Sequence, residues 1–203
     1  PSLLNEETTP RIGEYCIDAK IKGLYAHVTT EFTIHNDNHR TFEGELEFPL
    51  PDGGVVCGYA IDLQGVMTPA SVVEREEARS AFENEVKKGI DPGLVEQVRG
   101  NAYRTRIYPL PAKGSRRVRI EYLASLVHGE NGDAALYLPM PHTKLERRDV
   151  EIMVDMPDGP APRLSGLGNR TFVQAQAVWR VETHDNDITP DDDLLIAVPT
   201  LPK

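Results

Sequence analysis

Five arginine residues gather on two neighbouring runs of the sequence in which polar and apolar residues alternate. They are Arg104, Arg106, Arg116, Arg117 and Arg119. Because successive side chains of a strand point to opposite faces, residues 103–110 and 116–126 are predicted as strands, and the short connection between them predicts a hairpin. The outward face of such a hairpin would present a row of cations that could hold an anionic partner.

The predicted arginine row needs a counter-charge, because like charges on neighbouring strands destabilise a sheet by roughly 0.2–1 kcal/mol per pair. One source is internal, since Glu43, Glu45 and Glu47 alternate outward along another predicted strand, residues 42–50. The other source is an anionic partner, such as a sulfated glycan or an acidic protein face. We favour the internal pairs, because charge rows on sheets are usually local ion pairs, and we keep the anionic partner as the alternative.

Acidic residues are densest near the end of the sequence. This cluster consists of Asp185, Asp187, Asp191, Asp192 and Asp193. Calcium prefers several carboxylate oxygens, so such a loop could hold a cation. The glycine and the terminal glutamate of an EF-hand loop are missing, however, and Pro190 interrupts the cluster. We therefore expect a solvated acidic loop without a metal ion, and the sequence suggests no cofactor.

The histidines form no recognisable catalytic pattern. They are His27, His35, His39, His128, His142 and His184. A nucleophilic enzyme needs a base positioned beside a serine or a cysteine, and no Gly-x-Ser-x-Gly motif occurs in the sequence. We therefore predict a protein without catalytic residues, and a hydrolytic or transferase enzyme is the least favoured of three functional hypotheses.

Cys16 and Cys57 are the only cysteines. Neither a CxxC motif nor a cysteine and histidine spacing suited to zinc is present. Both cysteines lie in strand-like runs, where a free cysteine behaves as a small buried hydrophobic residue. We therefore expect two buried thiols, and a single disulfide bond between them stays open as an alternative.

The net charge of the chain indicates which classes of partner are not expected. The 203 residues carry a formal net charge of −10, with 32 acidic against 22 basic side chains. Nucleic acids and anionic membrane surfaces bind concentrated positive charge, so neither is expected as the main partner. No run of apolar residues is long enough to cross a bilayer, so no transmembrane segment is predicted.

Period-two alternation predicts a mainly β protein. The clearest strand is residues 24–34, in which Ala26 and Val28 share one face. One short amphipathic helix is expected at about residues 74–88, which Gly89 can terminate. Further strands are expected at residues 42–50, 55–63, 66–73, 103–110, 116–126, 134–138, 150–156, 172–181 and 194–198. This pattern predicts an antiparallel β-sandwich with one short helix.

Several short stretches occur in the same order as in one known family. They are Gly23-Leu24-Tyr25-Ala26-His27-Val28, Glu45-Leu46-Glu47-Phe48-Pro49-Leu50-Pro51, Val73-Glu74-Arg75-Glu76-Glu77-Ala78-Arg79, Gly93-Leu94-Val95-Glu96-Gln97, Ile107-Tyr108-Pro109-Leu110-Pro111 and Val118-Arg119-Ile120-Glu121-Tyr122. With these stretches, residues 23–126 resemble the VIT domain (vault protein and inter-α-trypsin inhibitor heavy chain). The resemblance implies a VIT domain at residues 1–130 and a β-rich extension packed on it at residues 131–203.

The resemblance also implies a function. VIT domains are often followed by a von Willebrand type A domain, which holds a divalent cation through an Asp-x-Ser-x-Ser loop, and no such loop occurs in this sequence. The metal-dependent adhesion chemistry of that domain is therefore not expected here. The resemblance implies a non-catalytic interaction and scaffolding module of a VIT-containing protein, which positions a protein partner or an adjacent domain. The alternative is a carbohydrate- or glycosaminoglycan-binding module that uses the basic hairpin. An extracellular, periplasmic or cell-surface location is favoured over the cytoplasm, and the compartment stays open.

Overall fold

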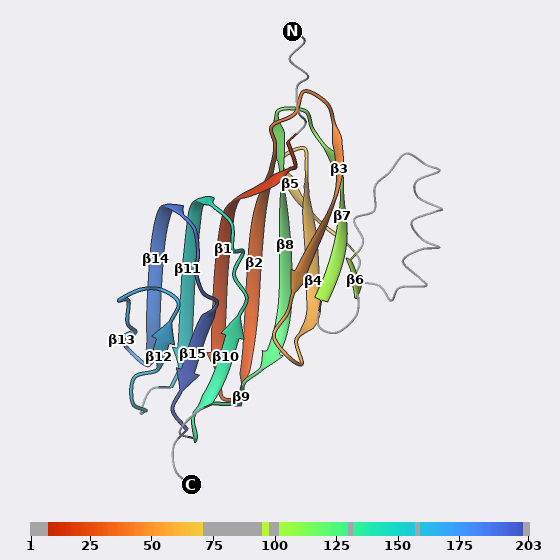
Figure 1. The fold of residues 1–203 in the computed structure, drawn as a ribbon. Helices are drawn as coiled ribbons and strands as arrows, with labels where there is room; N and C mark the ends of the chain where they lie inside the picture. Colours follow the sequence, from red (N-terminus) through yellow and green to blue (C-terminus); the bar gives the residue numbers. More distant parts are fainter. Residues whose placement is uncertain (1–7, 71–94, 98–101, 130–131, 157–158, 201–203) are drawn as a thin grey trace.

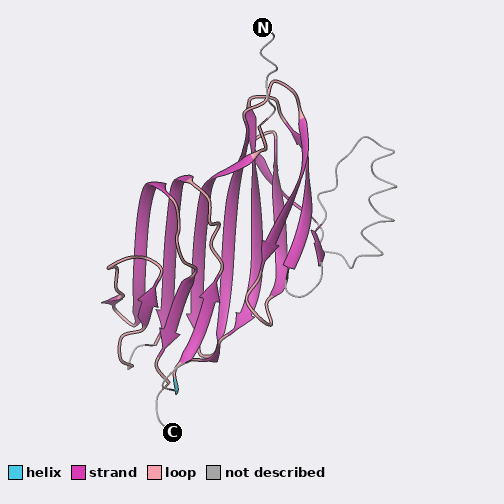
Figure 2. Cartoon of the chain, viewed as in Figure 1, coloured by secondary structure: helices cyan, strands magenta, loops and turns pink. Residues whose placement is uncertain are grey.

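The computed structural model describes residues 8–70, 95–97, 102–129, 132–156 and 159–200. Nearly all of its regular structure is strand (Figure 1, Figure 2). The strands are β1 (Arg11–Lys22), β2 (Tyr25–Asn36), β3 (Phe42–Pro49), β4 (Val55–Leu63), β5 (Val66–Pro69), β6 (Val95–Gln97), β7 (Ala102–Leu110), β8 (Gly114–Ser125), β9 (Val127–His128), β10 (Ala134–Leu138), β11 (Leu145–Asp155), β12 (Arg163–Ser165), β13 (Val173–Ala175), β14 (Val178–Ile188) and β15 (Leu194–Val198). The helix expected at residues 74–88 lies outside the described residues.

A large sheet of eight strands forms the body of the molecule. Its strand order is β13-β14-β11-β1-β2-β8-β4-β5. Neighbouring strands are antiparallel except β1 and β11, which run parallel over nine residue pairs, from Glu14 opposite Arg147 to Lys22 opposite Asp155. Strands from before and after residue 130 therefore belong to one continuous sheet (Figure 1).

Two smaller sheets cover one face of the large sheet. Their orders are β12-β15-β10-β9 and β3-β7-β6. Tyr15 of β1 donates a hydrogen bond of 3.2 Å to the carbonyl of Pro139, directly after β10, and Tyr59 of β4 shares one of 2.5 Å with Thr105 of β7. Both tyrosines are buried, so both small sheets pack on the same face. The prediction of a mainly β, antiparallel-rich sandwich is confirmed.

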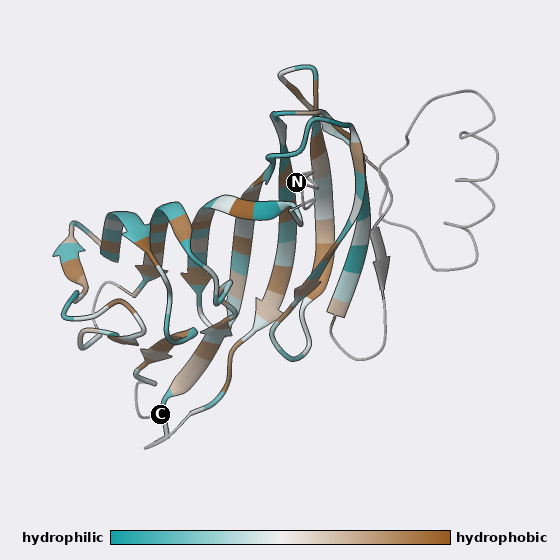
Figure 3. Ribbon diagram, turned by 45° about the horizontal axis from the view of Figure 1, so that its top comes forward, coloured by the Kyte–Doolittle hydropathy of each residue, from teal (hydrophilic) through white to brown (hydrophobic). Residues whose placement is uncertain are grey.

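The alternation of residue types explains which face is buried. Along β2, Ala26 and Val28 are fully buried and face the small sheets, whereas the side chains between them point to the other face. Figure 3 shows this alternation as successive teal and brown bands along the strands. Removing the apolar face from water drives the packing of the layers. Leu24 was expected on the buried face, but it lies in the turn before β2 and is 55% exposed.

The predicted hairpin of the two arginine-bearing strands is wrong. β7 pairs with β3 and β6, whereas β8 pairs with β2 and β4 in the large sheet. The buried side chains of β7, such as Thr105 and Ile107, and those of β8, such as Val118 and Ile120, lie in opposite layers of the sandwich. The chain therefore buries both apolar faces against one another, which a hairpin within one layer would not do.

Asn36 joins these layers where β7 turns into β8. It is 1% exposed, and its amide nitrogen donates to the carbonyls of Leu110 at 3.2 Å, Pro111 at 3.0 Å and Arg40 at 2.8 Å. Its oxygen accepts hydrogen bonds from the backbone and the side chain of Asn38. This buried amide links the end of β2 to carbonyls at the end of β7 and in the turn after it, and these bonds help to fix the crossing from the small sheet to the large one.

Candidate interaction face

The second face of the large sheet carries the outward side chains of β14, β11, β1, β2, β8 and β4, and we call it the outer face. The registers of these strands align their side chains in rows that cross the sheet. Directly opposite one another in one row are Glu182, Glu151, Asp18, Thr29 and Glu121. Acidic side chains therefore occupy four of five neighbouring strands in that row.

The next row adds further titratable groups. It consists of His184, Asp149, Cys16, Glu31 and Arg119. The six carboxylates of the two rows form what we call the acidic stripe. Its members are Asp18, Glu31, Glu121, Asp149, Glu151 and Glu182. Carboxylates opposite one another on adjacent strands repel, so the stripe depends on cations around it.

Arginines partly neutralise the stripe from its edges. Arg180 of β14 contacts both Glu151, at 3.0 Å, and Glu182, at 2.8 Å. Arg119 of β8 donates from Nε and Nη2 to one oxygen of Glu31, at 3.0 and 2.9 Å. Arg147 contacts Asp149 at 2.5 Å, Arg117 contacts Glu31 at 3.7 Å and Lys20 contacts Asp18 at 3.6 Å. Five of the six carboxylates therefore have an arginine or lysine partner, and Glu121 lies 3.8 Å from His27.

Asp149 is the most strongly tied member of the stripe. It lies 2.5 Å from Arg147 and accepts from His184 Nδ1 at 2.9 Å, while His184 Nε2 lies 3.2 Å from Glu182. Partial burial opposes ionisation of Asp149, but the hydrogen bonds from Arg147 and His184 hold its pKa below the ordinary value. The bond to Asp149, followed by that to Glu182, raises the pKa of His184. Burial, and then the Asp149 charge, raise the pKa of Cys16 to about 11.

A hollow of about 310 Å³ opens in the middle of the stripe. The short side chains of Cys16, Asp18 and Thr29 line it together with the longer Glu31, Glu151, Glu182, Arg119 and His184. Acidic and basic side chains therefore both border the hollow. Charged and polar groups surround a space that the chain itself does not fill.

An apolar group lies at one end of the outer face. Tyr25 is 67% exposed, Val55 60% and Leu123 48%. Val55 lies opposite Leu123, which lies opposite His27, two positions from Tyr25. Side chains two residues apart on a strand share a face. These three residues, which we call the apolar end, therefore form a patch next to Glu121 of the stripe.

The five arginines predicted as one row do not share a surface. On β7, Arg104 approaches Glu47 at 3.2 Å and Glu45 at 3.6 Å, and Arg106 approaches Glu43 at 3.7 Å and Glu45 at 3.8 Å. These ion pairs lie on the exposed side of the small β3-β7-β6 sheet. The internal counter-charge expected from the sequence is present for this pair of arginines.

The other three arginines belong to the large sheet. Arg117 lies 3.3 Å from Asp62 and 3.7 Å from Glu31 on the outer face, beside Arg119. Arg116 is buried instead, because it occupies an inward position, and it donates to the carbonyls of Pro109 at 2.7 Å and Asp62 at 2.5 Å. Arg116 is thus a structural residue near the start of β8.

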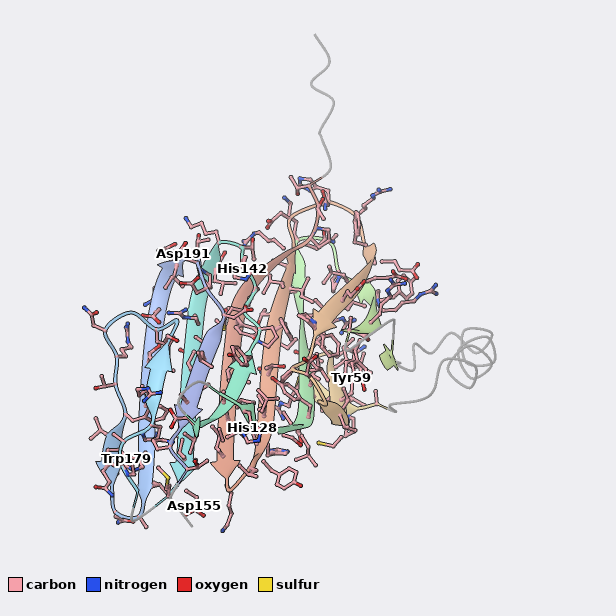
Figure 4. All side chains as sticks on the ribbon, turned by 60° about the horizontal axis from the view of Figure 1, so that its bottom comes forward. Tyr59, His128, His142, Asp155, Trp179 and Asp191 are labelled. Carbon is pink, nitrogen blue, oxygen red and sulfur yellow. The ribbon has the colours of Figure 1, made fainter. Side chains whose placement is uncertain are left out.

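The predicted aspartate cluster is not gathered into one site. Asp185 lies 2.8 Å from Arg148 and 2.6 Å from Arg170, and Asp193 accepts from the backbone nitrogen of Met140 at 2.8 Å. Asp187 lies 3.8 Å from Lys144, whereas Asp191 and Asp192 are exposed in the loop before β15. Figure 4 shows Asp191 and His142 at one end of the strands, away from Asp155 and Trp179 at the other. Within the described ranges, no group of three histidine, cysteine or acidic residues is arranged to hold a metal ion.

The two cysteines are free and lie far apart. Cys16 is on β1 and Cys57 on β4, with β2 and β8 between them, which is about 14 Å at the spacing of sheet strands. No disulfide bond can join them at that distance. Cys57 was expected to be buried, but it occupies a β-bulge between Val56 and Gly58 and is exposed.

Comparison with known proteins shows which family part of the chain matches. The model of the vault protein inter-alpha-trypsin (VIT) domain family matches residues 12–122. The chain is 26% identical over 110 residues to the protein mono-ADP-ribosyltransferase PARP4 of Mus musculus, covering 54% of this chain and 6% of that protein. It is 25% identical over 146 residues to the inter-alpha-trypsin inhibitor heavy chain H3 of Pongo abelii, covering 70% of this chain and 16% of that protein. The chain therefore spans less than a fifth of the length of these curated relatives.

Solved structures share the fold at low sequence identity. A candidate nutrient binding protein of Legionella pneumophila superimposes with a TM-score of 0.62 at 12% identity, covering 93% of this chain and 66% of that one. The M1 zinc metallopeptidase of Deinococcus radiodurans superimposes with a TM-score of 0.56 at 11% identity, covering 94% of this chain and 42% of that one. Within the ranges that the structure describes, no helix is long and apolar enough to cross a membrane.

The family match covers more than half of the chain. It runs from the start of β1 to Tyr122 of β8 and so includes β1, β2, β4, β5 and most of β8 in the large sheet. Of the stretches that resemble the family, those within the described residues lie on or directly beside these strands and those of the β3-β7-β6 sheet. Residues 73–79, 93 and 94 lie outside the described residues. The chain therefore belongs to the VIT family, the family of the vault protein inter-alpha-trypsin domain.

Proposed function

We propose that the chain is a non-catalytic interaction module, which holds a protein partner or an adjacent domain of the same polypeptide in a fixed position. The observation that carries this proposal is the outer face. Charged rows and an apolar end lie side by side on it across neighbouring strands, all held by the backbone of one rigid sheet. Flat faces that combine charged and apolar groups are suited to protein contact.

The pKa shifts of the titratable groups also favour a binding role over a catalytic one. A general base must be able to accept a proton near neutral pH and must reach a substrate. On the outer face, Asp149 has a lowered pKa and is engaged by Arg147, and His184 has a raised pKa between two carboxylates. These groups stabilise each other's charged forms, which is the behaviour of an ion-pair network.

The extent of the alignments supports a module of a larger protein. The similarity to the mono-ADP-ribosyltransferase covers 6% of that protein, and the similarity to the heavy chain covers 16%. This chain therefore shares a segment with two relatives that are otherwise named as different kinds of protein. A shared segment of this kind fits a role in positioning other parts of a protein.

The proposal is tested by photo-crosslinking in the host cell. A photoreactive phenylalanine analogue is placed at position 123, on the outer face, or at position 137, on the outside of the β12-β15-β10-β9 sheet. A discrete crosslinked protein, or peptides of an adjacent domain, identified by mass spectrometry at either position, supports the proposal. Absence of crosslinks at both positions contradicts it, as does a catalysed reaction that persists through repeated purification of the chain.

A further inference from the structure

We infer that Asn169 is a site of N-linked glycosylation, and that the oligosaccharide it carries covers the free edge of β14. The inference goes beyond the proposed function and does not depend on it. It starts from Asn169-Arg170-Thr171, the only place in the sequence where serine or threonine follows an asparagine by two residues. This tripeptide is the acceptor of N-linked oligosaccharides. A tripeptide this short also arises by chance, so its place in the fold decides.

The acceptor tripeptide lies on an exposed turn between β12 and β13. The backbone nitrogen of Arg170 donates to the carbonyl of Leu167 at 3.4 Å, and Gly168 has the positive φ of 59° that lets the chain reverse. Asn169 and Thr171 are both exposed. Among the described residues, neither the carboxamide of Asn169 nor the hydroxyl of Thr171 takes part in a hydrogen bond. Both groups that a modifying enzyme must contact are therefore open to solvent.

Packed residues on both sides of the acceptor hold the turn in place. Leu167 is 1% exposed and Phe172 is 6% exposed, and Arg170 lies 2.6 Å from Asp185 of β14. Asn169 thus projects from a turn whose neighbouring residues are anchored. An oligosaccharide on its side chain would displace none of the packed groups, so the folded chain can carry the modification.

The same turn lies beside an edge of the large sheet that lacks a neighbour. β13 pairs with β14 only at residues 178–180, whereas β14 continues to Ile188. Among the described strands, none pairs with residues 181–188 on that side. Figure 1 shows β14 at the margin of the sheet, with the short β13 near one end of it. Unpaired backbone groups along such an edge can pair with a strand of another molecule.

The contact between Arg170 and Asp185 brings the acceptor to this edge. Asp185 belongs to the unpaired stretch of β14, and Asn169 directly precedes Arg170. A bulky, hydrated oligosaccharide on Asn169 would therefore occupy space that an incoming strand needs. Charged side chains and short strands keep the sheet edges of other proteins apart, and the oligosaccharide would do the same here.

The modification uses a donor that the chain does not supply. The donor is an oligosaccharide linked to a polyprenyl diphosphate, and an oligosaccharyltransferase catalyses the transfer. The side-chain nitrogen of Asn169 attacks the first carbon of the sugar and forms a C–N bond, while the bond from that carbon to the diphosphate oxygen breaks. One proton leaves the nitrogen, the polyprenyl diphosphate departs, and no group is oxidised or reduced. The inference therefore implies that the chain enters a compartment that contains this donor.

The test starts from the protein purified from its own host. Peptides that span residues 164–180 are analysed by mass spectrometry before and after treatment with a peptide-N-glycosidase, which releases the glycan and leaves an aspartate. We expect a heterogeneous increase in mass that this treatment removes. Peptides from the host protein that carry only unmodified Asn169 overturn the inference.

Matched variants, expressed in the same host, assign the site. Asn169→Gln and Thr171→Ala each destroy the acceptor tripeptide and should abolish the modification. Thr171→Ser keeps a hydroxyl at this position and should retain it. Asn186→Gln, at an exposed asparagine of β14 outside any such tripeptide, should leave it unchanged. All four positions are exposed, so circular dichroism should show a retained fold. Modification that persists in Asn169→Gln and Thr171→Ala overturns the assignment.

The covering of the β14 edge is tested on the same proteins. Sedimentation compares modified wild type with Asn169→Gln over a range of concentrations. We expect self-association of the variant to shift to lower concentration, whereas Asn186→Gln should behave as wild type. Equal self-association of wild type and Asn169→Gln contradicts the covering of the edge. Crosslinks at positions 123 and 137 decide the proposed function independently, so the two proposals fail separately.

Discussion

The guanidinium group of Arg148 is only 3% exposed, and its Nη2 lies 2.8 Å from Oδ2 of Asp185. The two residues face each other across β11 and β14 on the buried side of the large sheet. Thr183 donates a hydrogen bond of 2.9 Å to the same carboxylate, and Arg170 approaches its other oxygen at 2.6 Å. A carboxylate that the sequence suggested as a metal ligand is thus the counter-charge of a buried arginine.

Replacing Asp185 should therefore destabilise the fold. Asp185→Asn leaves a buried cation without its counter-charge, which costs about 3 kcal/mol of the free energy of unfolding. Asp187→Asn is the control, because Asp187 is 80% exposed and lies 3.8 Å from Lys144, and it should change stability by less than about 0.5 kcal/mol. Urea denaturation followed by circular dichroism measures both. Equal stability of the two variants would refute the role of the pair.

The same carboxylate predicts a loss of stability in acid. Burial opposes its ionisation, but hydrogen bonds from Arg148 and Thr183 and the nearby cations hold its pKa below the ordinary value of 3.8. A folded-state pKa below the unfolded value stabilises the fold above the unfolded pKa, and this stabilisation disappears as the pH falls through the folded pKa. Wild type should therefore lose more stability than Asp185→Asn between pH 7 and pH 3 in urea titrations. A difference in the opposite direction would contradict the assignment.

Asn36 should be required for the crossing between the layers. Asn36→Ala removes the donor to the carbonyls of Leu110, Pro111 and Arg40, and leaving buried carbonyls unsatisfied should cost about 3 kcal/mol. Asn186→Ala, at an exposed position of β14, should cost less than about 0.5 kcal/mol. Thermal unfolding of the two variants compares them directly, and a stable Asn36→Ala protein would show that other donors reach these carbonyls.

The two thiols should differ in reactivity. The thiolate is the nucleophilic form of cysteine, and the pKa of Cys16 is raised to about 11 by burial and by Asp149. Cys57 is exposed, and partial burial raises its pKa as well. Iodoacetamide at pH 8 should therefore modify Cys57 at least about tenfold faster than Cys16. Mass spectrometry of the intact chain, with Cys57→Ser as the control, measures the rates, and faster modification of Cys16 would be the contrary result.

The arginine surfaces should not retain a sulfated glycan at physiological salt. Arg104, Arg106, Arg117 and Arg119 each contact carboxylates within the chain, so an anionic ligand must compete with existing partners. We expect wild type, Arg104→Glu with Arg106→Glu, and Arg117→Glu with Arg119→Glu to elute alike from immobilised heparin. Retention of wild type that one double variant abolishes would instead support glycan binding at that surface.

Much of the fold follows from period-two patterns, but the pairing of strands does not. The alternation along residues 24–34 correctly predicted β2, and the same rule applied to Tyr15, Ile17, Ala19 and Ile21 would have revealed β1, which was missed. A period of two indicates which side chains share a face and contains no information about the neighbouring strand. That is why β7 and β8, adjacent in sequence, were predicted as a hairpin although they lie in opposite layers.

The candidate site was harder to predict than the fold for a related reason. The predicted site joined arginines that are close together in sequence, whereas the acidic stripe combines residues from β14, β11, β1, β2 and β8. Asp18 and Glu151 become neighbours only through the parallel pairing of strands separated by more than a hundred residues. Sequence spacing indicates which side chains lie close together along one strand. The acidic stripe instead crosses the strands, so its members are far apart in sequence.

The parallel seam between β1 and β11 makes the folding unit larger than the region of family similarity. A fragment that stopped after residue 122 would keep the matched segment but strip β1 of its neighbour over nine positions. Peptide groups along that bare border would be left to recruit a strand from another molecule, which is how incomplete sheets polymerise. The later strands thus protect the earlier ones from aggregation, because β11 covers an edge of β1 that would otherwise be free to pair with another copy of the fragment.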